Sequence, residues 1–133
     1  MPRNAVLEID GVPYKGVYSV SYEITTAKDI TGRPSDRARA GNIKIKRISD
    51  DNPDIARWAM DSAQKSWKPG KITFRDASRT LKELTWENGF ITRYSEVLPD
   101  VEKAADRQIF EEFEISCQKL KIADAELDNL WDE

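Results

Sequence analysis

Apolar and polar residues alternate along much of this chain with a period of two, which is typical of β-strands that bury one face. Residues 18–25 and 42–48 show the pattern most clearly. The first segment places on one face Tyr18, Val20, Tyr22 and Ile24, and on the other Ser19, Ser21, Glu23 and Thr25. The second places Ile43 and Ile45 inward and, outward, Asn42, Lys44 and Lys46. Both predicted strands therefore present a polar face.

Shorter patterns predict the remaining strands. They cover residues 5–10, 71–76, 81–87, 90–98 and 109–118, and the tail from residue 122 is a further strand or a short helical turn. Asn88-Gly89, between two of these segments, is a strong signal for a β-hairpin. The apolar faces of the later strands are expected to hold Ile72, Phe74, Leu84, Trp86, Ile109, Phe113, Ile115 and Cys117.

One helix is predicted, from Pro53 to about Ala63. Asp51 or Asn52 can cap its first turn, Pro53 suits the first helical position, and Asp54 complements the helix dipole. A stripe at helical spacing is formed by Ile55, Trp58, Ala59, Ser62 and Ala63. We therefore expect the helix to pack on a sheet through this stripe, with Trp58 in the core.

These elements predict a mainly β protein. Seven or eight strands and a single helix favour a closed or nearly closed antiparallel β-barrel, or else a sandwich, with the helix laid on its side. The chain of 133 residues fits a single domain, 1–133, that buries enough surface to fold alone. Strand spacing alone does not distinguish a barrel from a sandwich.

A long loop separates the two most regular strands. Residues 27–41, AKDITGRPSDRARAG, contain Ile30 as their only large apolar side chain, and Gly32, Pro34 and Gly41 interrupt regular structure. A connection of this length without secondary structure is uncommon in a compact domain and is usually disordered or functional. We interpret it as an extended assembly arm.

The charges are segregated along the chain, although the net charge is only −3. Residues 28–47 contain seven basic and two acidic side chains, whereas residues 100–133 contain eleven acidic and four basic ones. If the two blocks lie on opposite faces, identical copies attract head to tail, which builds rings or filaments. Two solvated patches, or pairing of the blocks within one chain, would explain the same pattern.

The residue types leave little room for catalysis. The chain has no histidine and one cysteine, which excludes Ser-His-Asp and Cys-His sites, zinc sites built on imidazole, and an internal disulfide. Residues 31–35, TGRPS, lack the second glycine and the lysine of a phosphate-binding loop. Asp50, Asn52 and Asp54 have the spacing that opens an EF-hand, but Ile55 stands where that loop needs glycine. We predict no enzyme activity, no cofactor and no metal.

The N-terminal sequence MPRNAVLEID lacks the apolar core of a signal peptide, and no segment approaches the length of a membrane span. We therefore expect synthesis in the cytoplasm, no membrane insertion and, for any export, a route other than a cleaved signal.

A monomeric barrel that binds a small ligand or a single-stranded nucleic acid is the main alternative. The basic groups Arg33, Arg37, Arg39, Lys44, Lys46 and Arg47 could follow a phosphate backbone, with stacking on Tyr18 or Tyr22. The acidic remainder of the chain argues against nucleic acid, because a specific binder is expected to have a dominant basic footprint. The alternative requires a ligand in an interior cavity, or an affinity for single strands that depends on salt.

Several segments together resemble a known family. They are TGRPS (31–35), residues 37–41 followed by NIKIKRIS, the helix with Trp58, GKITF (70–74), KELTWENG (82–89) and residues 115–131. In this order they resemble the Hcp-type (TssD) tube protein of bacterial type VI secretion, over nearly the whole chain.

The resemblance implies a β-barrel flanked by a helix, which assembles as a hexameric ring. Such rings stack head to tail into a hollow tube, a contractile sheath drives the tube and its spike into a target cell, and effectors ride inside. It implies no catalytic residues. Phage tail-tube proteins share the architecture, so a related contractile particle stays open, and a secreted enzyme on a tube fold is a distant third hypothesis.

The resemblance suggests as interface residues Arg33, Pro34, Arg37 and Arg39 of the arm. Trp131 is a further interface candidate, because a tryptophan in an acidic terminus needs a partner, which is either the domain itself or a neighbouring subunit. Polar strand residues that could line a wet lumen are Ser19, Ser21, Glu23, Thr25, Asn42, Lys44 and Lys46, and an ordinary exposed strand face explains them as well.

Overall fold

The computed structural model describes residues 3–49, 52–61, 67–76, 79–99 and 108–130. Within these ranges the chain forms eleven β-strands and one α-helix. The strands are β1 (Arg3–Ile9), β2 (Val12–Tyr14), β3 (Val17–Ser21), β4 (Ile24–Thr25), β5 (Arg39–Ala40), β6 (Ile43–Ser49), β7 (Lys68–Asp76), β8 (Arg79–Val97), β9 (Ile109–Ser116), β10 (Lys119–Ile122) and β11 (Ala125–Asp128), and the helix is α1 (Asp54–Asp61).

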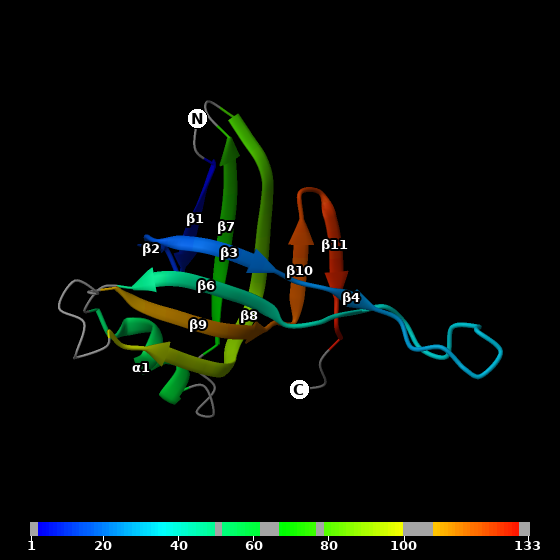
Figure 1. The fold of residues 1–133 in the computed structure, drawn as a ribbon. Coiled ribbons are helices and arrows are strands. Elements are labelled where there is room, and N and C mark those ends of the chain that lie inside the picture. Colours follow the sequence, from blue (N-terminus) through cyan, green and yellow to red (C-terminus); the bar gives the residue numbers. More distant parts are fainter. Residues whose placement is uncertain (1–2, 50–51, 62–66, 77–78, 100–107, 131–133) are drawn as a thin grey trace.

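Nine strands form one antiparallel sheet that folds over on itself. Its order is β2-β1-β7-β8-β9-β6-β3, and the β10–β11 hairpin pairs with the first part of β8, on the edge of β8 opposite β7. In Figure 1, β3, β6 and β9 cross in front of β1 and β7, and the long strand β8 bends from one layer into the other. The predicted mainly β class with antiparallel strands and one helix is confirmed. Closure into a barrel is not found, because no described residue of β3 pairs with β1.

The predicted hairpin at Asn88-Gly89 is wrong. Residues 79–97 form one continuous strand, whose first part pairs with β7 and β10 and whose second part pairs with β9. Asn88 does adopt the left-handed backbone, with a φ of 53°. A left-handed residue produces a bulge as readily as a turn. Here separate partner strands hold the two sides of Asn88 extended, so the chain bends without reversing.

The space between the layers is filled by apolar side chains. One layer contributes Leu7, Ile72, Leu84 and Trp86, and the other contributes Ile43, Ile45, Phe113 and Ile115. Trp86 fits against two glycines, since a Cβ on Gly70 would lie 2.0 Å from its Cζ2 atom and one on Gly89 would lie 2.5 Å from its Nε1 atom. The indole Nε1 donates to the carbonyl of Lys68 at 3.1 Å.

Helix α1 packs beside β8, as its apolar stripe predicts. Ile55 and Trp58 are 1% and 3% exposed. Asn52 caps the helix, because its Oδ1 atom accepts from the amide of Asp54 at 3.0 Å. The predicted stripe residues Ser62 and Ala63 lie outside the described residues. In the part of the chain that the structure describes, no helix is long and apolar enough to cross a membrane.

The predicted apolar face of β3 is only half right. Val20 and Tyr22 pack against the core, whereas Tyr18 and Ile24 are exposed. The pairing of β3 with β6 shifts register between Val17 and Ser19. This bulge accounts for Tyr18, because alternation read from the sequence fails across a bulge. Ile24 lies beyond the end of β3, in the exposed pair of β4 and β5. On β6, Ile43 and Ile45 point inward and Lys44 and Lys46 outward, as predicted.

Candidate assembly surfaces

The long loop forms an ordered arm that projects from the body of the domain (Figure 1). Contrary to the prediction, the arm has structure of its own. Ile24 and Thr25 of β4 pair with Ala40 and Arg39 of β5, and further out Lys28 forms an antiparallel bridge with Pro34. Every residue from 23 to 37 is exposed. The arm therefore gains its order from local hydrogen bonds and not from packing on the domain.

Asp29 closes the tip of the arm. Its Oδ1 atom accepts from the Thr31 amide at 2.9 Å, the Thr31 hydroxyl at 2.6 Å and the Arg33 amide at 3.1 Å. Gly32 supplies the left-handed backbone of this turn, with a φ of 88°. The hydrogen bonds from Thr31 and Arg33 hold the pKa of the Asp29 carboxyl below its usual range. The tip is therefore a preformed turn with an ionised carboxylate.

Asn129 fastens the root of the arm. Its side chain accepts from the Ala40 amide at 2.9 Å and donates to the Cys117 carbonyl at 3.0 Å, and it is 8% exposed. The backbone carbonyl of Asn129 accepts from the Arg37 guanidinium at 2.9 Å. The sequence analysis did not single out Asn129. A lone asparagine in an acidic tail gave no signal, because its partners in the arm, Arg37 and Ala40, lie about 90 residues away.

The predicted interface residues of the arm differ in what they contact. Arg33 and Pro34 are exposed near the tip. Arg37 binds the root through Asn129, and Arg39 forms an ion pair with Asp36 at 3.1 Å. The structure thus separates a tip that is free of the body from a root that is fixed to it. Trp131 lies outside the described residues.

The predicted lumen residues lie mainly on the outer face of β3 and β6. Cross-strand register aligns Ser21, Lys44, Glu114 and Arg93 in one row and Ser19, Lys46, Glu112 and Ser95 in the next. Asn42 is half-buried and donates to Thr92 and Glu114 at 3.2 Å each, whereas Glu23 and Thr25 are exposed near the root of the arm. These two rows are polar and carry both signs of charge.

Part of the charge segregation is cancelled within one chain. On β6 and β9, Lys44 stands opposite Glu114, Lys46 opposite Glu112, and Arg47 opposite Glu111. The internal pairing that the sequence left open therefore accounts for three of the seven basic residues in the first block. The argument for head-to-tail attraction now depends on the arm alone.

A buried polar network lies at one end of these strands. Arg47 and Glu111 are 2% and 1% exposed, and their Nη1 and Oε1 atoms are 2.7 Å apart. Arg47 Nε donates to the Lys15 carbonyl at 2.9 Å, and the Tyr94 hydroxyl donates to Glu111 Oε2 at 2.5 Å. Burial, together with Glu111 and Glu96, raises the pKa of Tyr94.

This network was missed by the sequence analysis, although a signal was present. Arg47 has the parity of Ile43 and Ile45, and Glu111 has the parity of Phe113 and Ile115. Two opposite charges at inward positions indicate buried charges that need partners, whereas the pairing of β6 with β9, which brings these two together, is decided by the fold.

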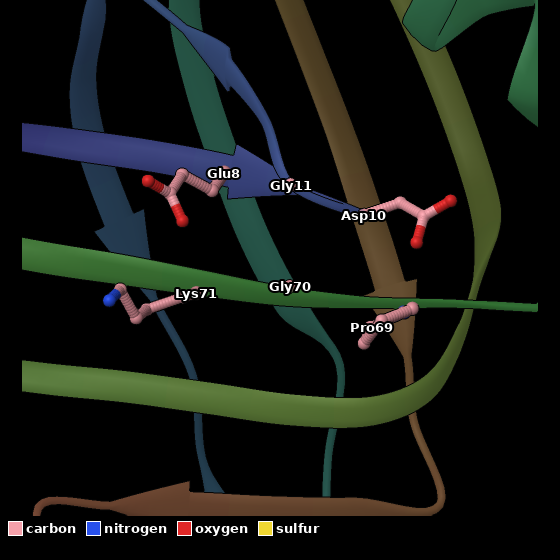
Figure 2. A pocket seen from close by; sticks show the side chains of 6 residues that line it. All are labelled: Glu8, Asp10, Gly11, Pro69, Gly70 and Lys71. Carbon is pink, nitrogen blue, oxygen red and sulfur yellow. The ribbon is translucent and has the colours of Figure 1, made fainter.

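The hollows of the surface do not assemble a reactive centre. One of about 250 Å³ lies between β1 and β7 (Figure 2). Its Glu8 and Lys71 side chains point to one side, and the Asp10 carboxylate lies at the opposite end. No group of three acidic or cysteine side chains that could hold a metal occurs among the described residues. Cys117 is buried at 1% exposure, and burial raises the pKa of its thiol to about 11.

Residues 1–132 match the family model of the hemolysin coregulated protein Hcp (TssD). The chain belongs to this family. It is therefore a type VI secretion tube protein, as its sequence suggested, and the family is a non-enzymatic one, which agrees with the prediction of no enzyme activity. No curated protein matches the chain.

Solved structures agree with this assignment. Hcp1 from Flavobacterium johnsoniae is 31% identical, with a TM-score of 0.77, and the match covers 94% of this chain and 98% of that one. A type VI secretion system effector from Yersinia pestis is 12% identical, with a TM-score of 0.69 and coverage of 94% and 99%. The baseplate of the anti-feeding prophage contains a chain that is 10% identical, with a TM-score of 0.55 and 89% coverage of each. The last two likenesses concern the fold alone.

A ligand enclosed at the centre of the described interior has little room, because buried side chains such as Trp86 and Phe113 fill that part of the space between the layers.

Proposed function

We propose that this Hcp-family chain assembles into hexameric rings that stack head to tail as the hollow inner tube of a type VI secretion apparatus. The observation that supports this most directly is the arm. A segment that is exposed from residue 23 to residue 37 and still internally hydrogen-bonded is suited to contact a neighbouring copy. Because it is preformed, little conformational entropy is lost when it docks.

The arm residues are assigned different parts in this assembly. Arg33 and Pro34, at the free end, contact the neighbouring copy. Arg37 and Arg39 set the direction of the arm through Asn129 and Asp36. Trp131, from the acidic C-terminal end, completes a contact with the domain or with a neighbour.

The outer face of β3 and β6 lines the lumen in this proposal. The lining set is Ser19, Ser21, Glu23, Thr25, Asn42, Lys44 and Lys46. Opposite charges on neighbouring strands, such as Lys44 and Glu114, leave the face wet and nearly neutral. These polar rows offer an effector no apolar surface to which it would adhere, whereas the next row of the same face carries Ile48, Phe110 and Val97.

Membership of the family supports the remaining partners of this proposal. In it, a contractile sheath surrounds the tube, a spike caps it, and effectors travel within the rings. In this proposal the protein is made in the bacterial cytoplasm and leaves with the tube, to the outside or into a target cell.

An arm-shortened variant tests this function. Asp29–Arg33 is replaced by Asn-Gly, which is the preferred two-residue hairpin turn, so that Lys28 and Pro34 stay paired. The wild type is expected to form rings and stacks by light scattering and negative-stain imaging. The variant is expected to keep its circular dichroism and thermal midpoint but to lose stacking. Normal tubes from the variant would refute the role of the arm, and a wild type that stays monomeric at all protein and salt concentrations would refute the assembly.

A further inference from the structure

The tip of the arm presents one apolar side chain to solvent. Ile30 has a relative exposure of 103%, the highest among the exposed large apolar residues. The hydrogen bonds of Asp29 to Thr31 and Arg33 hold the turn around it closed. An isoleucine held in water by a preformed turn gains free energy wherever an apolar site can receive it.

The domain has an apolar cleft on its unclosed side, where β3 crosses β1 and β7 without pairing to β1. The cleft has a volume of about 520 Å³. Its apolar lining comes from Ala5, Val17, Tyr18, Val20, Phe74 and Leu81. Four of these, Ala5, Val17, Val20 and Phe74, are partly buried and pack against the core, so the cleft opens directly onto it. Tyr18 and Leu81, at 55% and 44% exposure, flank the opening.

We infer that Ile30 of one copy docks into this cleft on a second copy of the chain. The inference rests on the proposed function and names the surface that receives the arm. The arm of a given copy projects away from its own sheets (Figure 1), so the occupant of the cleft comes from another molecule. A tip on one side and a receptor on another make the contact heterologous, which is the kind that propagates into rings and stacks.

Charge around the two surfaces agrees with this docking. Asp29 adjoins Ile30, and all of its hydrogen bonds within the described residues are to Oδ1, which leaves Oδ2 available. Arg75 and Lys82 are exposed at the cleft. A carboxylate that enters beside the isoleucine therefore meets two cations. The apolar insertion supplies affinity, and the ion pairs fix the orientation of the tip.

Disulfide trapping between two single-cysteine variants tests the contact. Ile30→Cys and an affinity-tagged Leu81→Cys are mixed, assembled and mildly oxidised, and the tag distinguishes the mixed dimer by mass. Cys117 does not compete, because it is buried. A mixed covalent dimer is expected to dominate. The matched control pairs Ile30→Cys with Met60→Cys on α1, where Met60 is 84% exposed but distant from the cleft lining, and it is expected to give only background.

A second measurement separates an apolar contact from simple proximity. Ile30→Ser is expected to raise the dissociation constant tenfold or more, because one buried aliphatic side chain contributes about that much to affinity. Ile30→Leu is expected to retain the affinity of the wild type. Asp29→Asn keeps the Oδ1 acceptor of the turn and is expected to reduce the salt dependence of assembly.

The outcomes distinguish this inference from the proposed function. Suppose that the wild type forms stacks. If Ile30→Cys is then trapped with Met60→Cys as readily as with Leu81→Cys, or if Ile30→Ser assembles like the wild type, the cleft is not the receptor. The tube function stands in either case. If the wild type does not associate, both are overturned.

Discussion

Removal of the Glu111 carboxylate should strongly destabilise the fold, although Glu111 lies on no surface assigned to assembly. In Glu111→Ala the Arg47 guanidinium stays buried and loses the anion that lies 2.7 Å away. Breaking a buried pair by removing one partner costs about 3–5 kcal/mol, because an uncompensated charge remains. The Tyr94 hydroxyl keeps Glu96 as a partner at 2.8 Å, so the loss of its hydrogen bond to Glu111 adds little to the cost. We expect the free energy of unfolding to fall by about 4 kcal/mol.

The assay is urea unfolding of the dissociated protein, monitored by circular dichroism. With a slope of about 2 kcal/mol per molar urea, the expected loss lowers the midpoint by about 2 M. The matched control is Glu112→Ala, the next residue, which is exposed and faces Lys46 on the outer side of the sheet. An exposed cross-strand pair of this kind contributes below about 1 kcal/mol.

A double variant checks the physical cause. Arg47→Met with Glu111→Leu replaces both charges by apolar groups of similar size, and it should recover most of the loss, because the cost arises from the unpaired charge. The reasoning is refuted if Glu111→Ala and Glu112→Ala cost the same. It is also refuted if the double variant is no more stable than Glu111→Ala.

Three further predictions concern the core and one turn. Burial raises the Cys117 thiol pKa from about 9 to about 11, so between these pH values only the unfolded chain releases the proton. The free energy of unfolding should therefore fall by up to about 3 kcal/mol as the pH rises through this window. Denaturant titrations of Cys117→Ala should show a smaller fall over the same pH range. Gly70→Ala places a Cβ 2.0 Å from the Trp86 ring and should cost about 3 kcal/mol. Gly41→Ala meets the Glu23 Cγ atom at 2.9 Å and the Glu23 carbonyl at 3.2 Å, and should cost less than Gly70→Ala in the same assay. Ala123 has a φ of 54° in the turn between β10 and β11, a backbone conformation that glycine adopts without strain. Ala123→Gly should therefore raise the free energy of unfolding by roughly 0.5–1 kcal/mol and, with it, the thermal midpoint. An unchanged or lower midpoint would contradict this.

The position of the candidate site in the chain could be predicted from the sequence, but its internal order could not. Residues 27–41 were identified as an arm because they contain almost nothing to bury. The tip turn closed by Asp29 and the bridge between Lys28 and Pro34 give no apolar periodicity. Local hydrogen bonds order this segment, and a search for buried faces does not detect them.

The alternation of the sequence determined which faces of most strands are buried, because a period of two follows from the covalent geometry of an extended chain. It predicted Ile43 and Ile45 inside and Lys44 and Lys46 outside, and the same parity on β9. Helix α1 was also determined by the sequence, because its cap and its apolar stripe at helical spacing are local features.

Only the tertiary structure decided which strands pair and where the chain bends. Asn88-Gly89 has the local chemistry of a hairpin, yet β7 and β9 hold its two flanks as one strand. The partners of Asn129 and the pairing of Arg47 with Glu111 depend on residues far away in the chain. A bulge, a long-range hydrogen bond and a buried ion pair are each fixed by the atoms that surround them in the folded state, and that environment does not exist until the strands have paired.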